Sequence, residues 1–143
     1  MGKTILVVDD ERMITSTLSS LIKMVLKYTV SAYNDPVQAL QSDELVQQGV
    51  DLIISDFMMP GMNGIEFLKN AREKHPDAVT ILLTGYADKE NAIKSINELG
   101  LYYYLEKPWD NNMLIKIIQN GLEKKELSDS LKQKYAEIKE SHK

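Results

Sequence analysis

The sequence predicts an α/β fold: a parallel β-sheet with helices on both of its faces. Segments with the composition of strands alternate five times with segments of helical periodicity, and the connections between them are short. The first strand segment, residues 4–8, is continuously apolar and β-branched, as expected for a strand buried on both faces. With 143 residues, 43% of them apolar, the chain suits one domain with a substantial core.

The first two helices are predicted from an apolar face and from capping residues. Residues 11–27 form the first helix. Its core face consists of Ile14, Leu18, Leu21, Ile22 and Val25. Residues 28–33 alternate weakly between apolar and polar side chains and predict the second strand. Asp35 as N-cap and Pro36 in the first turn then predict a second helix, which ends near Gly49.

Turn residues and helix caps delimit the middle of the chain. A short run rich in isoleucine, residues 51–55, predicts a third, buried strand that is followed by a turn. Residues 63–74 predict the third helix, because they open with an N-terminal capping motif. Residues 78–84 predict the fourth strand, and Asp88 can cap a short helix over residues 88–98.

The fifth strand, residues 101–105, contains three consecutive tyrosines. Since successive side chains of a strand point to opposite faces, Tyr103 is expected to lie opposite Tyr102 and Tyr104 and to pack in the core. Asp110 follows a turn and can cap the last helix.

The last helix is expected to run past the domain, which we place at residues 1–125. Residues 126–143 are then a helical tail or linker. Leu131, Tyr135 and Ile138 have the 4-then-3 spacing of a coiled-coil seam, but the same register is broken upstream. Two interpretations stay open: a solvated tail, or the start of a linker helix that dimerises or leads to an output domain beyond the end of this chain.

Composition excludes several classes of function. The net charge is −4 and no cluster of lysine and arginine opposes it, so direct binding of nucleic acid has no electrostatic support. The chain has no cysteine, which excludes disulfides and thiolate metal sites. No apolar stretch reaches the ~20 residues of a membrane span, and no signal peptide is recognisable. We expect a cytoplasmic protein without membrane contact.

Polar side chains follow four of the predicted strands. Asp9 and Asp10 end the first strand, Asp56 the third, Thr84 the fourth, and Lys107 follows the fifth. Because parallel strands end at one edge of the sheet, these side chains are expected to meet there. Three clustered carboxylates repel one another and favour a cation, and an oxygen-only ligand set suits Mg²⁺. A carboxylate beside a cation, an ammonium and a hydroxyl suggests phosphoryl transfer to the carboxylate.

Each of these residues also has an ordinary interpretation when it is taken alone. Asp10 could serve only as a helix cap, Thr84 as a strand-end threonine, and Lys107 as a surface lysine. The joint pattern favours the site, since four separate strand ends each supply a side chain that this chemistry needs.

These motifs resemble the receiver domain of two-component response regulators. The matching segments are Ile-Leu-Val-Val-Asp-Asp-Glu at 5–11, Asp-Phe-Met-Met-Pro-Gly-Met-Asn-Gly at 56–64, Leu-Leu-Thr-Gly at 82–85 and Leu-Glu-Lys-Pro at 105–108. The resemblance covers about residues 3–125. It implies a flavodoxin-like, doubly wound sheet of five parallel strands in the order 2-1-3-4-5, here with an extended C-terminal helix.

The resemblance also implies a role for each residue at the edge. Asp56 would accept a phosphoryl group from a phosphohistidine of a sensor histidine kinase or a histidine phosphotransfer protein. Asp10 would bind Mg²⁺ directly and Asp9 mainly through water, with Asp56 and the backbone carbonyl of Met58 as further ligands. Lys107 would contact the phosphoryl group, and the peptide bond that follows it, to a proline, is expected to be cis.

A second set of residues would report the phosphorylated state. Thr84 and Tyr104 would form the switch pair and relay the state to a face around residues 88–125. This face, or the C-terminal helix, offers a surface for a homodimer. Met58 and Tyr86 line the path of the attacking water in such domains, and their bulk suggests a slowly hydrolysed acyl phosphate. The kinase, the signal and the output are not readable.

Three other functions compete with this interpretation. A Mg²⁺-dependent aspartyl phosphatase would place a second aspartate two residues after the nucleophile, where this chain has Met58. A flavin-binding protein would want a phosphate loop after the first strand, where Asp9 and Asp10 would repel a phosphate. A passive receiver-like binding module would lack site residues that are all present here. We therefore expect no turnover of an external substrate.

Overall fold

The computed structural model describes residues 2–85 and 88–141 of the chain. Its strands are β1 (Thr4–Val8), β2 (Thr29–Tyr33), β3 (Leu52–Asp56), β4 (Val79–Thr84) and β5 (Tyr103–Glu106). Its helices are α1 (Arg12–Leu26), α2 (Pro36–Leu40), the π-helical turn η1 (Glu44–Gln48), α3 (Gly64–Lys74), α4 (Lys89–Leu99) and α5 (Asn111–Ser141). The five strands are parallel and lie in the order β2-β1-β3-β4-β5, as predicted.

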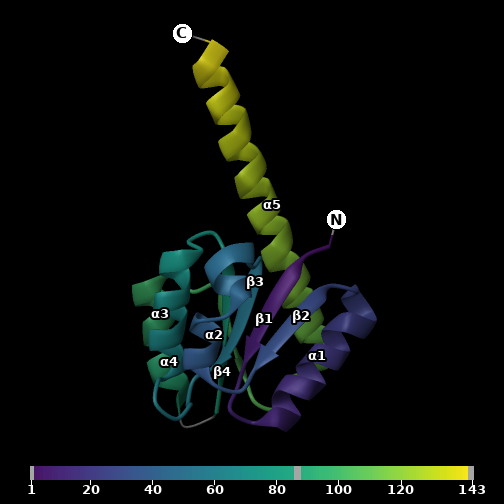
Figure 1. The fold of residues 1–143 in the computed structure, drawn as a ribbon, viewed down its shortest axis with the longest axis vertical. Coiled ribbons are helices and arrows are strands. Elements are labelled where there is room, and N and C mark those ends of the chain that lie inside the picture. Colours follow the sequence, from purple (N-terminus) through teal and green to yellow (C-terminus); the bar gives the residue numbers. More distant parts are fainter. Residues whose placement is uncertain (1, 86–87, 142–143) are drawn as a thin grey trace.

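The sheet separates two hydrophobic clusters. Alternate residues of the central strands point to opposite sides, so that Leu6 and Ile53 pack in one cluster and Ile5 and Ile54 in the other. The first cluster is covered by α2, α3 and α4, and the second by α1 and α5. Figure 1 shows α3 and α4 on one side of the sheet and α1 on the other. Both faces of the central strands are thus buried, which explains their continuous apolar composition.

The register of the strands brings the predicted polar residues to one edge. Val8 pairs with Ser55, Asp56 with Leu83, and Thr84 with Glu106. Asp9 therefore follows β1 beside the end of β3. The polar side chains predicted from the sequence therefore lie at the carboxyl edge of the sheet.

The helix predicted between Asp35 and Gly49 is not continuous in the structure. Asp35 does cap α2, because its Oδ1 accepts a hydrogen bond from the Val37 amide at 2.8 Å. The helix then stops at Leu40 and resumes as η1. The buried Ser42 lies at the break: its Oγ donates to the Ala39 carbonyl at 2.6 Å and accepts from the Leu45 amide at 3.4 Å. A serine that bonds the local backbone competes with the helical pattern.

Two predictions about the fifth strand, its first residue and the place of Tyr103, are wrong. Strand β5 begins at Tyr103, two residues later than expected, and it lies at the edge of the sheet. Tyr103 is 40% exposed, so its predicted place in the core is wrong. Tyr102 precedes the strand and packs with the α1/α5 cluster, whereas Tyr104 packs with the cluster on the α4 side. The alternation that we assumed begins only with the strand itself.

Helix α5 continues without a break from the body of the domain to Ser141, as Figure 1 shows. Ion pairs hold its middle turns against the amino-terminal edge of the sheet. Lys125 lies 3.6 Å from Asp51, and Glu126 lies 2.9 Å from Lys3. The domain boundary that we expected at residue 125 thus falls inside one helix and stays a prediction. Within the described residues, no helix combines the length and the apolar character that a membrane span requires.

Candidate functional site

Three carboxylates meet at the carboxyl edge of the sheet. Asp9 is buried, Asp56 is 6% exposed, and Asp10 is exposed to solvent. One oxygen of each carboxylate lies within 4.8 Å of the others. The sequence placed these three residues at one edge, and the structure brings them into one cluster.

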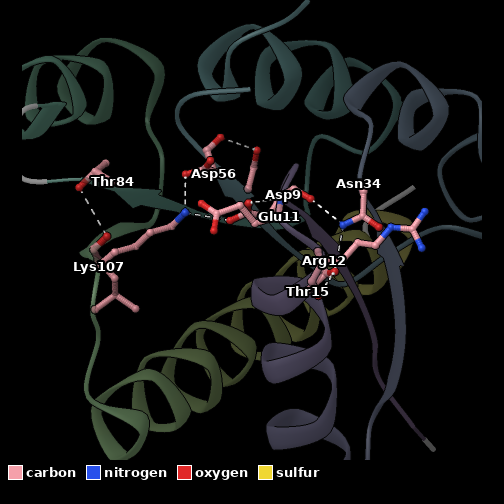
Figure 2. A network of polar contacts seen from close by, with 10 residues as sticks. Asp9, Glu11, Arg12, Thr15, Asn34, Asp56, Thr84 and Lys107 are labelled. Carbon is pink, nitrogen blue, oxygen red and sulfur yellow. Dashed lines mark hydrogen bonds and ion pairs between the residues drawn. The ribbon is translucent and has the colours of Figure 1, made fainter. Parts of the chain in front are cut away.

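Lys107 joins the two buried carboxylates. Its Nζ lies 2.9 Å from Oδ2 of Asp9 and 3.0 Å from Oδ1 of Asp56. Figure 2 shows the lysine side chain reaching across from the end of β5 to both acids. The backbone amide of Lys107 donates to the Thr84 carbonyl at 2.8 Å, and the peptide bond to Pro108 is cis, as the resemblance implied.

The cluster perturbs the pKa of each buried group. Burial raises the pKa of Asp56 to about 6; the Lys107 ammonium opposes this rise, and the Asp9 charge adds to it. Burial likewise raises the pKa of Asp9. For Lys107, burial lowers the pKa, but the hydrogen bonds to both carboxylates outweigh it, so the net pKa is raised. One ammonium among three carboxylates leaves an excess of negative charge.

This donor set fits a hard divalent cation. Its ligands are oxygens only, and the exposed side of Asp10 leaves room for water molecules, which Mg²⁺ retains. Met58 lies in the loop after β3 with its side chain 60% exposed, so that side chain does not fill the cluster. A cation at this place would offset the repulsion among the carboxylates.

Thr84 ends β4, where its carbonyl accepts from the Lys107 amide, and Tyr104 lies on the neighbouring strand β5. The buried Thr84 hydroxyl donates to the Leu105 carbonyl at 3.5 Å. The half-buried Tyr104 ring stacks on Tyr103, with a centroid distance of 6.0 Å and an interplanar angle of 19°. Tyr86, expected to line the path of water, lies outside the described residues.

Two further residues shape the site and were not identified from the sequence as site residues. Gly64 lies so close to Asp56 that a Cβ would collide with the Asp56 carbonyl, and its amide donates to the Phe57 carbonyl at 2.7 Å. Asn34 donates from Nδ2 to the Asp9 carbonyl at 2.9 Å. A signal for Asn34 was present, since it directly follows β2 at the same edge.

Comparison with known proteins agrees with this geometry. The family described as the response regulator receiver domain matches residues 5–119. The chain belongs to this family. Receiver domains are parts of two-component response regulators and typically act as signalling modules rather than as enzymes.

Two similar relatives are transcriptional regulators. The hydrogenase transcriptional regulatory protein HoxA of Cupriavidus necator is 35% identical over 138 residues, which are 96% of this chain and 28% of HoxA. The transcriptional regulatory protein CpxR of Escherichia coli is 36% identical over 125 residues, which are 87% of this chain and 51% of CpxR. This receiver domain therefore spans about half or less of these relatives.

A solved receiver domain has the same fold. The response regulator receiver domain protein from Clostridium thermocellum superimposes with a TM-score of 0.80 at 30% identity. The match covers 87% of this chain and 98% of that one. The receiver fold thus accounts for nearly all of that structure and for the body of this one.

Proposed function

We propose that this receiver domain is a phosphorylation-controlled signalling switch whose phosphoacceptor is Asp56. The observation that carries the proposal is the position of the Asp56 carboxylate, in contact with the Lys107 ammonium and within 4.8 Å of oxygens of Asp9 and Asp10. A carboxylate so placed can act as a nucleophile while cations hold the phosphoryl oxygens.

The phosphoryl donor is a phosphohistidine of a sensor histidine kinase or a histidine phosphotransfer protein. An Asp56 carboxylate oxygen attacks phosphorus, the P–N bond breaks as the P–O bond forms, and the leaving imidazole takes up a proton. With a pKa of about 6, Asp56 is mostly ionised at neutral pH and therefore nucleophilic. Lys107 then pairs with a phosphoryl oxygen, which releases its contact with Asp56.

Mg²⁺ supplies charge neutralisation at the phosphoryl oxygens when it is bound. Asp10 and Asp56 would bind it directly, Asp9 mainly through water, and the Met58 backbone carbonyl would complete the protein ligands. The support is the oxygen-only cluster and its surplus of negative charge.

Thr84 and Tyr104 relay the phosphorylated state. The Thr84 hydroxyl, which bonds the Leu105 carbonyl, turns to the phosphoryl group, and the half-buried Tyr104 ring moves inward. The change is read on the face of α4, β5 and α5, where Lys89 and Glu106 lie 3.0 Å apart. The domain, residues 1–125, would pass it to an output domain, a downstream protein or a second copy of the chain, through this face or the helical tail 126–143.

A Mg²⁺-dependent phosphatase is the alternative, and Met58 argues against it because it cannot act as an acid or base. The bulk of Met58 would shield the acyl phosphate from water and so favours slow hydrolysis. The domain would then store the phosphoryl group, as a member of a cytoplasmic phosphorelay. A phosphoryl half-life of seconds that Met58→Asn leaves unchanged would contradict this shielding.

One experiment tests the proposed function. The protein is incubated with Mg²⁺ and acetyl phosphate, and its intact mass is measured. We expect one added phosphoryl group in the wild type and in Asp43→Asn, a surface control with the same charge change, and none in Asp56→Asn or with EDTA. An unmodified wild type would refute the proposal, and multiple-turnover release of phosphate from esters would indicate a phosphatase.

A further inference from the structure

One asparagine outside the carboxylate cluster holds the loop that carries two members of the cluster. We propose that Asn34 is a positioning residue for the metal site: it fixes the backbone of the acidic loop, residues 9–12, and thereby the place of Asp10. The inference rests on the proposed Mg²⁺ site. It adds to that site a residue after β2, a strand that contributes no ligand.

Asn34 uses both hydrogens of its amide group on this loop and on the helix that follows it. Its Nδ2 donates to the Asp9 carbonyl at 2.9 Å and to Thr15 Oγ1 at 3.0 Å. The direction of these bonds is determined by chemistry. A carbonyl can only accept, and Thr15 Oγ1 already donates its hydrogen to the Arg12 carbonyl at 3.1 Å.

Together these hydrogen bonds form a chain that links the two ends of the acidic loop. Figure 2 shows it running from Asp9 through Asn34 and Thr15 to Arg12. The Asp9 carbonyl lies at the start of the loop and the Arg12 carbonyl at its end, so both ends are held. Inside the loop, the Glu11 amide donates to Asp9 Oδ1 at 2.9 Å. Asp9 and Thr15 are buried, so water replaces a lost bond poorly.

Asp10 depends on this backbone more than its neighbours do. Asp9 and Asp56 are each held by Lys107. For the exposed Asp10 carboxylate, the part of the chain that the structure describes offers no hydrogen bond or ion pair. Its place near the other two carboxylates therefore follows from the loop alone. A looser loop spreads Asp10 over more positions, and a cation must then order it on binding, which lowers affinity.

A purely structural role for Asn34 is the alternative, and the adjacent residue provides a control for it. The Tyr33 hydroxyl donates to Glu44 Oε2 at 2.9 Å, in η1 rather than in the acidic loop. The Tyr33 backbone carbonyl accepts from the Asp9 amide at 3.2 Å, and a side-chain substitution retains that bond. Tyr33→Phe therefore removes a half-buried hydrogen bond next to Asn34 without touching the loop.

The experiment has two arms. In EDTA, hydrogen exchange of the Glu11 amide is measured by NMR; in buffer, the Kd for Mg²⁺ alone is measured by calorimetry. We expect Asn34→Ala to speed the exchange and to weaken Mg²⁺ binding by about three- to tenfold, as the loss of one hydrogen bond predicts. Thr15→Val should act in the same direction, Thr15→Ser should retain wild-type values, and Tyr33→Phe should change neither quantity.

The outcomes separate this role from the proposed function. If the wild type and Asn34→Ala bind Mg²⁺ with equal affinity, the role of Asn34 is overturned and the phosphoacceptor site is left intact. Equal weakening by Tyr33→Phe and Asn34→Ala overturns it as well, because the effect is then general destabilisation. A wild type that binds no Mg²⁺ overturns both the metal site and this inference.

Discussion

Replacing Asp56 with asparagine should stabilise the metal-free protein at neutral pH. Burial raises the pKa of Asp56 to about 6 from its ordinary value of 3.8, so the folded protein binds this proton more tightly than the unfolded chain does. Stability that depends on a raised pKa is present below the ordinary pKa and is lost as the pH rises through the folded pKa. The wild type should therefore lose stability between about pH 4 and pH 7.

The size of the effect follows from the same two pKa values. The difference between 6 and 3.8 corresponds to about 3 kcal/mol of unfolding free energy, and the side chain is too buried for solvent to screen much of it. The asparagine that replaces Asp56 would carry no charge at any pH, so this loss disappears in the variant. A smaller pH dependence remains, because the pKa of Asp9 is also raised by burial.

Urea unfolding in EDTA at about pH 5 and about pH 7.5 measures this prediction. Wild type, Asp56→Asn and the surface control Asp43→Asn are compared. The gain in unfolding free energy from Asp56→Asn should be about 1.5 kcal/mol at the lower pH and about 3 kcal/mol at the higher one. Mg²⁺ should stabilise the wild type more than the variant. The reasoning is refuted if wild type and Asp56→Asn lose stability equally between the two pH values.

Three further predictions concern residues around the site. Lys107→Met leaves two buried carboxylates without their ammonium, so urea unfolding in EDTA should show a loss of about 2 kcal/mol at neutral pH and less at about pH 5, where Asp56, with a pKa of about 6, is largely protonated; equal losses at both pH values would contradict this. Gly64→Ala forces a Cβ onto the Asp56 carbonyl and should cost at least about 2 kcal/mol in thermal unfolding, whereas Gly2→Ala, in open space, should be neutral. Asp110→Ala removes the 3.0 Å cap bond to the Met113 amide and should cost about 1 kcal/mol while the Kd for Mg²⁺ stays unchanged; a changed Kd would contradict a capping role.

Much of the site follows from the sequence because parallel topology is a strong constraint. Once the alternation of strands and helices indicates a parallel sheet, every strand must end at the same edge. Asp9, Asp56 and Lys107 each come within two residues after a predicted strand segment, so their meeting needs no knowledge of packing. The contacts of Lys107 with both acids agree with that inference.

Other features depend on burial and on position in the sheet, which tertiary packing decides. The break between α2 and η1 comes from Ser42, whose buried hydroxyl bonds the local backbone, and the exposure of Tyr103 follows from its place on an edge strand. The role of Asn34 requires β2 to lie beside β1, since the two residues that it joins are 25 and 19 positions away.

The sequence by itself determined which polar residues follow which strands, and therefore which carboxylates belong to the site. Only the tertiary structure decided how those carboxylates behave. The pKa of Asp56 rises because packing removes water from it, and burial is a property of the assembled layers rather than of any local segment. The same packing leaves Asp10 open to solvent, and so decides from which side a cation can reach the site.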